Sequence, residues 1–230
     1  MPSYYPIMLD IRDRLAIVIG GDRIAAEKAA ALAASGARVT VLATDVCDEL
    51  RTLASQPGSN ITLRLKTYAP GDLEGAFVVV ASTRNPDEIA AIRAETRERN
   101  QLLNVVDVPA ACDYIVPSIL RRGQLTIAVS TEGASPSLAK RIRQRLETLF
   151  PPAYAAYLRL AAAARRQLRA ASVTYDRRDE FFAAYDTSNV LARLTAGDAA
   201  AAVVLTAALL DDYSIDASPG ALEEAIEADE

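Results

Sequence analysis

Histidine is absent from this chain of 230 residues, and cysteine is scarce. Because histidine is the commonest general base near neutral pH and the commonest metal ligand, acid–base chemistry falls here to carboxylates, Tyr, Lys or hydroxyl groups. The two cysteines, Cys47 and Cys112, are too few for a disulfide framework or a cysteine metal cage. The sequence therefore predicts no metal site and a cytoplasmic protein.

Long apolar runs are also absent. Even the apolar segment 199–210 is followed directly by Asp211 and Asp212, so no apolar segment approaches the roughly 20 residues that a bilayer crossing needs. Residues 1–14 lack the basic start and apolar block of a secretory signal. A net charge of -5 argues against nucleic acid as the main partner, while an apolar fraction of 51% suffices for one large domain or two modest ones. We expect a soluble protein without a membrane or nucleic-acid partner.

The stretch 15–28, LAIVIGGDRIAAEK, carries the main signal. Its apolar run ends at Gly20 and Gly21, and an alanine-rich helical pattern follows, which predicts the strand, tight turn and helix of a dinucleotide-binding unit. In the pattern G-x-G-x-x-G/A, Gly20 takes the first place and Ala25 the last, but Asp22 takes the middle place. A carboxylate is a poor neighbour for a diphosphate. Two alternatives stay open: a cofactor-binding turn, or a turn that binds nothing and whose Asp22 caps the helix.

A second predicted strand, 37–43, completes a βαβ unit with parallel strands. Roughly 20 residues beyond the glycines, where this fold places a side chain on the adenosine ribose, the chain has Thr44 and Asp45. An acid there suits a free ribose hydroxyl and repels a phosphate, which favours NAD over NADP. The alternative is that Thr44 or Asp45 caps the helix that runs through Leu53.

Polar residues follow two further predicted strands. Ser82 and Thr83 come directly after 76–81, and Asp107 follows the strand 102–106. Ligands of open α/β sheets bind at the carboxyl ends of the strands, so these three residues are candidate site residues. For Asp107 the alternative is a turn residue before a proline.

After residue 114 the pattern changes to two β-type runs about a turn. The runs 115–120 and 124–130, separated by 121–123, predict an antiparallel hairpin appended to the parallel sheet. Ser135 as a cap, with Pro136 at the first helical position, predicts the start of a helix.

Four stretches of the sequence, in the order in which they occur, resemble the motifs of one family. The stretches are YYPIMLDIRDRLAIVIGGDRIAAEKAAAL, VVVASTRN, NVVDVPAACDYIVPSIL and LTIAVSTEGASPSLAKRIRQRLE. The family is the siroheme synthase N-terminal module, that is, precorrin-2 dehydrogenase, which in some members is also sirohydrochlorin ferrochelatase. The resemblance covers about the first two-thirds of the chain, and the ordered set is much more specific than the glycine turn alone.

The resemblance implies a homodimeric enzyme of siroheme biosynthesis that oxidises precorrin-2 to sirohydrochlorin with NAD. The family's essential aspartate matches Asp107, which we expect to be partly buried and to act as the general base. Because the substrate carries many carboxylates, its pocket should present cations and free N–H groups. The implied cofactor contacts are Gly20, Gly21, Asp22, Arg23, Ile24, Thr44 and Asp45, with Ser82 and Thr83 added by position, and the candidate substrate contacts are Asn104, Thr131, Ser135 and Lys140.

We therefore predict an α/β fold in which a Rossmann-like parallel sheet is followed by a β-hairpin/helix dimerisation region and a small C-terminal helical domain. Helical periodicity between residues 153 and 210 indicates the helical domain. The end of the chain is acidic and poor in apolar residues, which indicates a disordered tail. The expected divisions are 1–113 for the NAD-binding Rossmann domain, 114–150 for the dimerisation and substrate-cleft region, 151–215 for the helical domain and 216–230 for a disordered tail.

Two alternatives to the dehydrogenase stay open. The chain could insert iron into sirohydrochlorin, alone or in addition, with a carboxylate such as Asp107 accepting the pyrrole protons. It could instead bind a tetrapyrrole or a nucleotide without catalysis, because Asp22 stands where the family usually has a third consecutive glycine.

Overall fold

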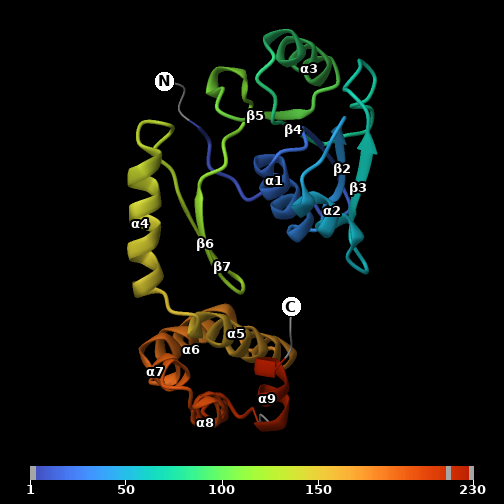
Figure 1. The fold of residues 1–230 in the computed structure, drawn as a ribbon. Helices are drawn as coiled ribbons and strands as arrows, with labels where there is room; N and C mark the ends of the chain where they lie inside the picture. Colours follow the sequence, from blue (N-terminus) through green and yellow to red (C-terminus); the bar gives the residue numbers. More distant parts are fainter. Residues whose placement is uncertain (1–3, 216–218, 228–230) are drawn as a thin grey trace. The chain divides into compact units, whose positions relative to one another are not determined.

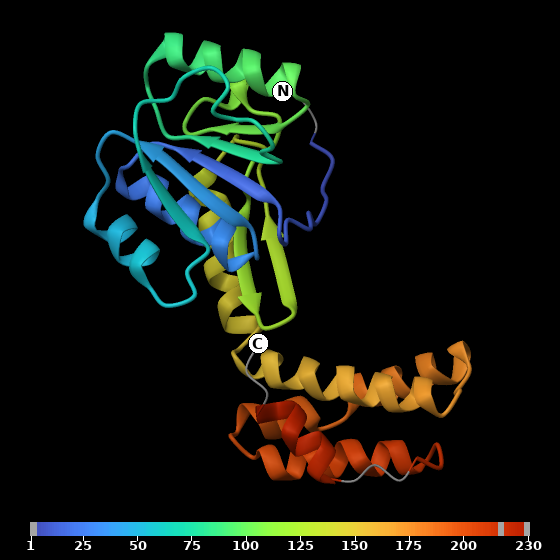
Figure 2. The same cartoon turned by 90° about the vertical axis from the view of Figure 1, so that its right-hand side faces the viewer.

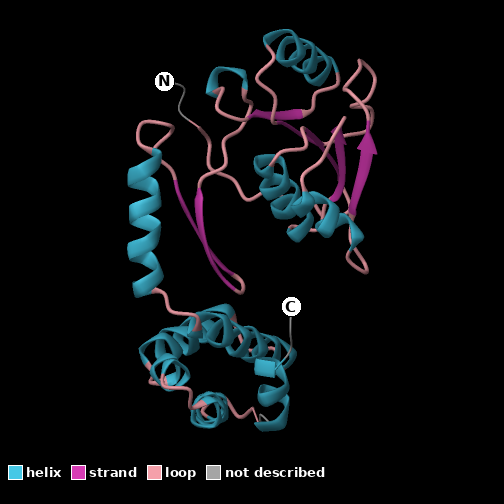
Figure 3. Cartoon of the chain, in the orientation of Figure 1, coloured by secondary structure: helices cyan, strands magenta, loops and turns pink. Residues whose placement is uncertain are grey.

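The computed structural model describes residues 4–215 and 219–227 of the chain. The chain divides into two compact units, one up to Val116 and the other from Pro117 onward (Figure 1). Each unit has a hydrophobic core of its own. Within the described residues, all strands lie before residue 136 and only helices follow (Figure 3).

A five-stranded parallel sheet forms the centre of the first unit (Figure 2). In spatial order its strands are β3 (Ile61–Leu65), β2 (Arg38–Ala43), β1 (Leu15–Ile19), β4 (Val78–Ala81) and β5 (Leu102–Val105). The chain runs outward from β1 to one edge and then crosses back to build the other half beside β1. The carboxyl ends of β1 and β4 therefore meet at a switch in strand order, where ligands of such sheets bind.

Helices cover both faces of this sheet. On one face lie α1 (Arg23–Ala34) and α2 (Asp48–Ser55), and on the other lies α3 (Pro86–Glu98). All residues of β4 are buried, because a central parallel strand contacts helices on both faces, and this explains its uninterrupted apolar sequence. A short 3-10 helix, η1 (Pro109–Ala111), follows β5. The predicted parallel α/β architecture is confirmed.

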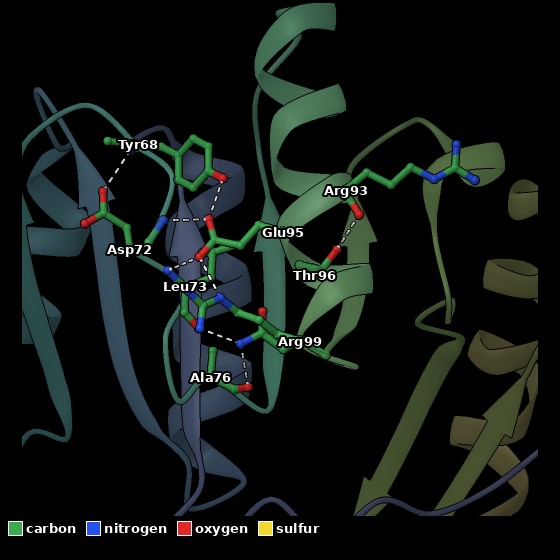
Figure 4. A network of polar contacts seen from close by, with 11 residues as sticks. Tyr68, Asp72, Leu73, Ala76, Arg93, Glu95, Thr96 and Arg99 are labelled. Carbon is green, nitrogen blue, oxygen red and sulfur yellow. Dashed lines mark hydrogen bonds and ion pairs between the residues drawn. The ribbon is translucent and has the colours of Figure 1, made fainter.

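A buried glutamate ties α3 to the loop that precedes β4 (Figure 4). The carboxylate of Glu95, which is 7% exposed, accepts hydrogen bonds from the Tyr68 hydroxyl (2.7 Å), the N–H groups of Gly71 (3.0 Å) and Leu73 (3.2 Å), and Nε of Arg99 (3.0 Å). Burial alone would raise the pKa of Glu95, but these donors together hold it below its usual value. The carboxylate thereby fixes α3 against the sheet.

An antiparallel hairpin begins the second unit and forms a two-stranded sheet of its own. Its strands are β6 (Ser118–Arg122) and β7 (Leu125–Val129). The predicted antiparallel hairpin is confirmed, and it forms a sheet separate from the parallel one; the turn expected at 121–123 is wrong. The turn consists of Gly123 and Gln124 alone, because Gly123 adopts a φ of 54° and permits a two-residue loop.

Helices make up the rest of the second unit. The first, α4 (Pro136–Leu149), begins as predicted, because the Ser135 hydroxyl accepts a hydrogen bond from the N–H of Leu138. The others are α5 (Ala153–Ala170), α6 (Tyr175–Thr187), α7 (Val190–Thr195), α8 (Ala199–Asp211) and α9 (Pro219–Glu227). None of the described helices has the length and apolar character that a membrane crossing requires.

Aromatic side chains anchor the core of these helices. Phe181 and Tyr185 of α6 are fully buried, and the Tyr185 hydroxyl donates to the carbonyl oxygen of Tyr157 on α5 (3.1 Å). The Tyr157 hydroxyl in turn donates to the Asp186 carboxylate (2.6 Å). Both hydroxyls thus keep a hydrogen-bond partner inside an apolar core, so the two helices are held in one register.

Helix α9 corrects the prediction of a disordered tail over 216–230. Leu222 is fully buried, and Ile226 packs against the same core. Nε of Arg159 also donates to the carbonyl oxygen of Ile226 (3.1 Å). The segment is acidic on average, but its few apolar residues recur at helical spacing and so bury one face. Residues 216–218 and 228–230 lie outside the described residues.

Candidate active site

Two glycines set how closely the β1–α1 turn packs against the sheet. Gly20 has a φ of 124°, and a Cβ atom there would lie 2.9 Å from Cβ and from the carbonyl oxygen of Ser82. A Cβ atom on Gly21 would lie 1.8 Å from the carbonyl oxygen of Asp45. Both positions therefore require glycine for the fold itself, because the segments that follow β4 and β2 press against this turn.

Asp22 caps the N-terminus of α1, which is the role that the second of the two alternatives for this turn gave it. Its Oδ1 accepts a hydrogen bond from the N–H of Ala25 (2.8 Å). The Ser82 hydroxyl donates to the same carboxylate, at 3.0 Å from Oδ1 and 3.2 Å from Oδ2. The carboxylate is therefore held where the turn of a dinucleotide-binding unit presents its N–H groups to a diphosphate.

The cap leaves two backbone N–H groups at the start of α1 without a hydrogen-bond acceptor among the described residues. The N–H of Ala25 bonds to the Asp22 side chain and the N–H of Ala26 to its carbonyl oxygen. The N–H groups of Arg23 and Ile24 donate to no group among the described residues. Because the first N–H groups of a helix and its dipole attract anions, these two donors can still bind a phosphate oxygen.

A cavity of ≈ 380 Å³ opens at this point of the sheet. The α1 start, the end of β4 and the end of β5 each contribute to its wall. Its volume lies within the range of small-molecule sites. It is lined by Asp22, Ile24, Ser82, Thr83, Arg84, Val106 and Asp107. The structure therefore brings the predicted turn residues, the polar end of β4 and Asp107 into one cavity.

Asp107 lies just beyond β5 in a left-handed backbone conformation, with a φ of 60°. Asp adopts this conformation more readily than most residues, which agrees with a turn. The expectation of partial burial is wrong: Asp107 is exposed, because the chain has left the sheet after Val105. Its carboxylate accepts no hydrogen bond from another described residue and faces water in the cavity wall.

Asn104 supports the loop around Asp107 and does not line the cavity. It is 8% exposed, and its side-chain amide donates to the carbonyl oxygen of Tyr114 (3.0 Å). The half-buried thiol of Cys112 also holds this loop, because it accepts from the N–H of Val105 (3.2 Å). Burial raises the pKa of the Cys112 thiol, so it stays protonated and serves packing.

Thr44 and Asp45 lie beside the turn but outside the cavity wall. Neither caps α2, because that helix begins one turn later, after Cys47, without a side-chain cap. The Asp45 carboxylate instead accepts from the N–H of Val46 (2.9 Å) and pairs with Arg51 (2.8 Å). The capping alternative is therefore wrong for both residues, and their contact with a ribose stays a prediction.

Three residues predicted to bind substrate belong to the second unit. The Thr131 hydroxyl accepts from the N–H of Ser135 (3.1 Å), and Ser135 caps α4. Lys140 is exposed on that helix. These bonds give Thr131 and Ser135 a local structural role, and their contact with substrate stays a prediction.

Comparison with known proteins places these features in a family. A family model described as "Putative NAD(P)-binding" matches residues 7–118, and one described as "Sirohaem biosynthesis protein central" matches residues 122–149. The siroheme synthase of Pseudomonas entomophila is 34% identical over 227 residues, which cover 95% of this chain. The chain belongs to the siroheme synthase N-terminal module family.

Further relatives of this module agree. The siroheme synthase of Methylobacillus flagellatus is 40% identical over 157 residues, which cover 68% of this chain and 32% of that protein. The solved structure of "SirC, precorrin-2 dehydrogenase" matches with a TM-score of 0.73 and 25% identity, over 91% of this chain and 98% of that one. The chain spans about half the length of the curated relatives it matches, 49% for the Pseudomonas protein. The family resemblance drawn from the motifs is confirmed.

Sequence reasoning on this module missed two features of the cavity. Arg84 lines it, and its only sequence signal is its place directly after the polar end of β4. The hydrogen bond between Ser82 and Asp22 joins residues 60 positions apart, so no local sequence pattern could predict it. Among the described residues, no group of three or more His, Cys, Asp or Glu side chains is placed to hold a metal ion.

Proposed function

We propose that this chain oxidises precorrin-2 to sirohydrochlorin with NAD, a step of siroheme biosynthesis. One observation carries the proposal: the α1 start and Asp107 line the same cavity at the switch in strand order. An anion-binding helix start and a carboxylate in one cavity are what a dehydrogenase of this kind needs, because it must hold a dinucleotide and accept a proton. The family membership supports the same reaction.

The residues around the turn fit an anionic cofactor. Gly20 and Gly21 keep the turn free of side chains, and the N–H groups of Arg23 and Ile24 are available to a diphosphate. Ser82 and Thr83 add hydroxyl groups to the cavity wall. When bound, NAD supplies the acceptor for the hydride that leaves the substrate.

Asp107 is the proposed general base. The substrate loses a hydride and a proton, and the Asp107 carboxylate accepts the proton. Its exposed position in the cavity wall leaves the carboxylate accessible to a substrate. Binding of the substrate would then exclude water from this group, which strengthens its interaction with the departing proton.

Turnover of purified protein with precorrin-2 and NAD, followed by NADH and sirohydrochlorin absorbance, tests the function. We expect Asp107→Asn to lower kcat by about 10²–10⁴-fold, because asparagine cannot accept the proton. Asparagine tolerates the left-handed backbone at this position, so the variant should melt at the same temperature as the wild type. Wild-type protein that produces no NADH would refute the reaction, and full turnover by the variant would refute only the role of Asp107.

NAD affinity distinguishes the enzyme from a binder without catalysis. The enzyme should bind NAD in calorimetry with a Kd below about 1 mM, because enzymes typically have KM values of about 1 μM to 1 mM. A tetrapyrrole binder would bind NAD at millimolar concentration or weaker and would still bind sirohydrochlorin.

The proposal includes a homodimer in the cytoplasm, joined through the region 114–150. In this region Ile119, Leu138 and Leu149 are 36%, 42% and 67% exposed, so they are available to an apolar interface. A second copy of the chain would bury them. Both cysteines are free thiols, which agrees with a reducing compartment.

A further inference from the structure

A second hollow of the first unit, with a volume of ≈ 620 Å³, runs along α3. Its floor is apolar. Pro86, Ile89 and Ala94 of α3 contribute one side, and Val108 and Ala111 at η1 contribute the other. The α3 residues that line the hollow recur at three- and four-residue spacing, so they form one face of the helix: Pro86, Ile89, Ala90, Arg93, Ala94 and Arg97. Of these, Ile89 also packs against the core that contains Ile92. We call this hollow the α3–η1 groove.

Three arginines edge the α3–η1 groove: Arg84, Arg93 and Arg97. None of the residues that line the groove is acidic. Throughout residues 4–215 and 219–227, no carboxylate forms an ion pair with any of the three. Arg99 differs, because Glu95 neutralises it, and Figure 4 shows Arg93 extending away from that pair. Three unpaired guanidinium groups beside one apolar floor attract an anion that also has an apolar face.

The α3–η1 groove begins at the candidate active site. Arg84 lines both the groove and the cavity that contains Asp107. Val108, in the groove wall, directly follows Asp107 in the chain. The groove therefore adjoins the cavity that contains the proposed general base.

We propose that the α3–η1 groove binds the tetrapyrrole, with the macrocycle over the apolar floor and Arg84, Arg93 and Arg97 paired to its peripheral carboxylates. The proposal rests on the proposed function for the identity of the ligand. Guanidinium groups bind carboxylates through two parallel hydrogen bonds, so each arginine fixes both position and orientation. The groove thus supplies cations from the same unit as Asp107, in addition to the residues predicted from the sequence.

Direct binding of sirohydrochlorin, measured by calorimetry and by its absorbance change, tests the groove. We expect Arg93→Gln and Arg97→Gln each to raise the Kd for sirohydrochlorin about tenfold, the effect of one lost charged hydrogen bond. The KM for precorrin-2 should rise in parallel, while kcat and the Kd for NAD change less than about twofold. Arg97→Lys should retain part of the affinity, because it keeps the charge and loses only the paired geometry.

Arg64→Gln provides the matched control. Arg64 lies exposed on β3 of the same unit, outside both the cavity and the groove, and the substitution removes the same charge. It should leave sirohydrochlorin affinity unchanged. Arg97 is also exposed, so Arg97→Gln should fold like the wild type, and equal melting temperatures check this.

The outcomes separate the groove from the reaction. If the arginine variants bind sirohydrochlorin as tightly as the wild type, or if they lower only kcat, the groove proposal is overturned even where turnover supports the dehydrogenase. If the wild type shows no dehydrogenase activity but its sirohydrochlorin affinity depends on Arg93 and Arg97, the reaction fails and the groove stands. Wild-type protein that does not bind sirohydrochlorin overturns the groove proposal.

Discussion

At the scale of single residues, the carboxylate of Asp22 has two opposed effects. It caps α1 through the N–H of Ala25, which stabilises the helix, and it places a negative charge where a diphosphate would bind. The bond from Ser82 keeps the carboxylate at this position. The cost to cofactor binding is therefore one of charge, and removal of the charge should leave the cap in place.

Asp22→Asn isolates the charge from the cap. Asparagine caps helices as well as aspartate does, so we expect the free energy of unfolding to change by less than about 0.5 kcal/mol. NAD should bind about tenfold more tightly, because a repulsion of one unit charge is removed. Calorimetry with NAD and urea unfolding measure the two quantities. Equal NAD affinity in the variant and the wild type would show that the diphosphate does not approach this turn.

The predicted contact of Asp45 with the ribose makes coenzyme choice a test of Asp45 and its partner Arg51. In the proposed site the carboxylate would repel the 2′-phosphate of NADP, and its ion pair with Arg51 occupies the guanidinium that would attract this phosphate. We expect Asp45→Asn to improve the NADP affinity about tenfold and to change the NAD affinity less. The double variant Asp45→Asn, Arg51→Gln should lose most of this gain. An unchanged ratio of NADP to NAD affinity in Asp45→Asn would contradict contact between this segment and the ribose.

At the scale of elements, the Glu95 carboxylate holds α3, and α3 carries one wall of the α3–η1 groove. The hydrogen bonds that lower the pKa of Glu95 exist only in the folded protein. The folded state therefore binds a proton less readily than the unfolded state does. This contribution to stability is fully present above the unfolded pKa and is lost as the pH falls through the lower, folded pKa.

Glu95→Gln tests this ion pair and its pH dependence. At neutral pH we expect the free energy of unfolding to fall by about 2–3 kcal/mol, because buried donors and Arg99 lose a charged acceptor. The difference from the wild type should begin to shrink below about pH 4, where Glu95 is protonated in the unfolded state but still ionised in the folded one, and should vanish as the pH falls through the lower, folded pKa. Glu98→Gln, an exposed site on the same helix, is the control and should change stability little. Urea unfolding across pH measures both, and a difference that stays constant with pH would contradict the argument.

Local sequence signals predicted the structural features that neighbouring residues determine. The apolar run of β4, the glycine turn after β1 and the cap at Ser135 each arise from neighbouring residues, and the structure has all three. Contacts distant in sequence were missed. The segment at Leu222 was expected to be disordered because its composition is acidic, but packing on α5 and α8 orders it. Asp107 was expected to be partly buried, but it is exposed because the chain has left the sheet there. The prediction failed because no pattern in the sequence shows where the chain leaves the sheet.

At the scale of the whole molecule, the cavity with Asp107 and the residues proposed for association belong to different units. The cavity and the α3–η1 groove consist entirely of residues from the first unit. The exposed apolar side chains Ile119, Leu138 and Leu149 belong to the second unit. Loss of association should therefore leave NAD binding unaltered, because the residues proposed to hold NAD all lie in the other unit.

Ile119→Glu combined with Leu138→Glu tests the proposed homodimer. Each carboxylate would be buried without a partner in an apolar interface, so we expect the dimer Kd to rise at least about 30-fold. Sedimentation at micromolar concentration should then show a particle of 24.6 kDa in place of one twice as heavy. Val204→Glu is the matched control, because Val204 is 61% exposed on α8, outside the region 114–150. Wild-type protein that sediments as a monomer, or a control that dissociates as readily as the double variant, would contradict association through this region.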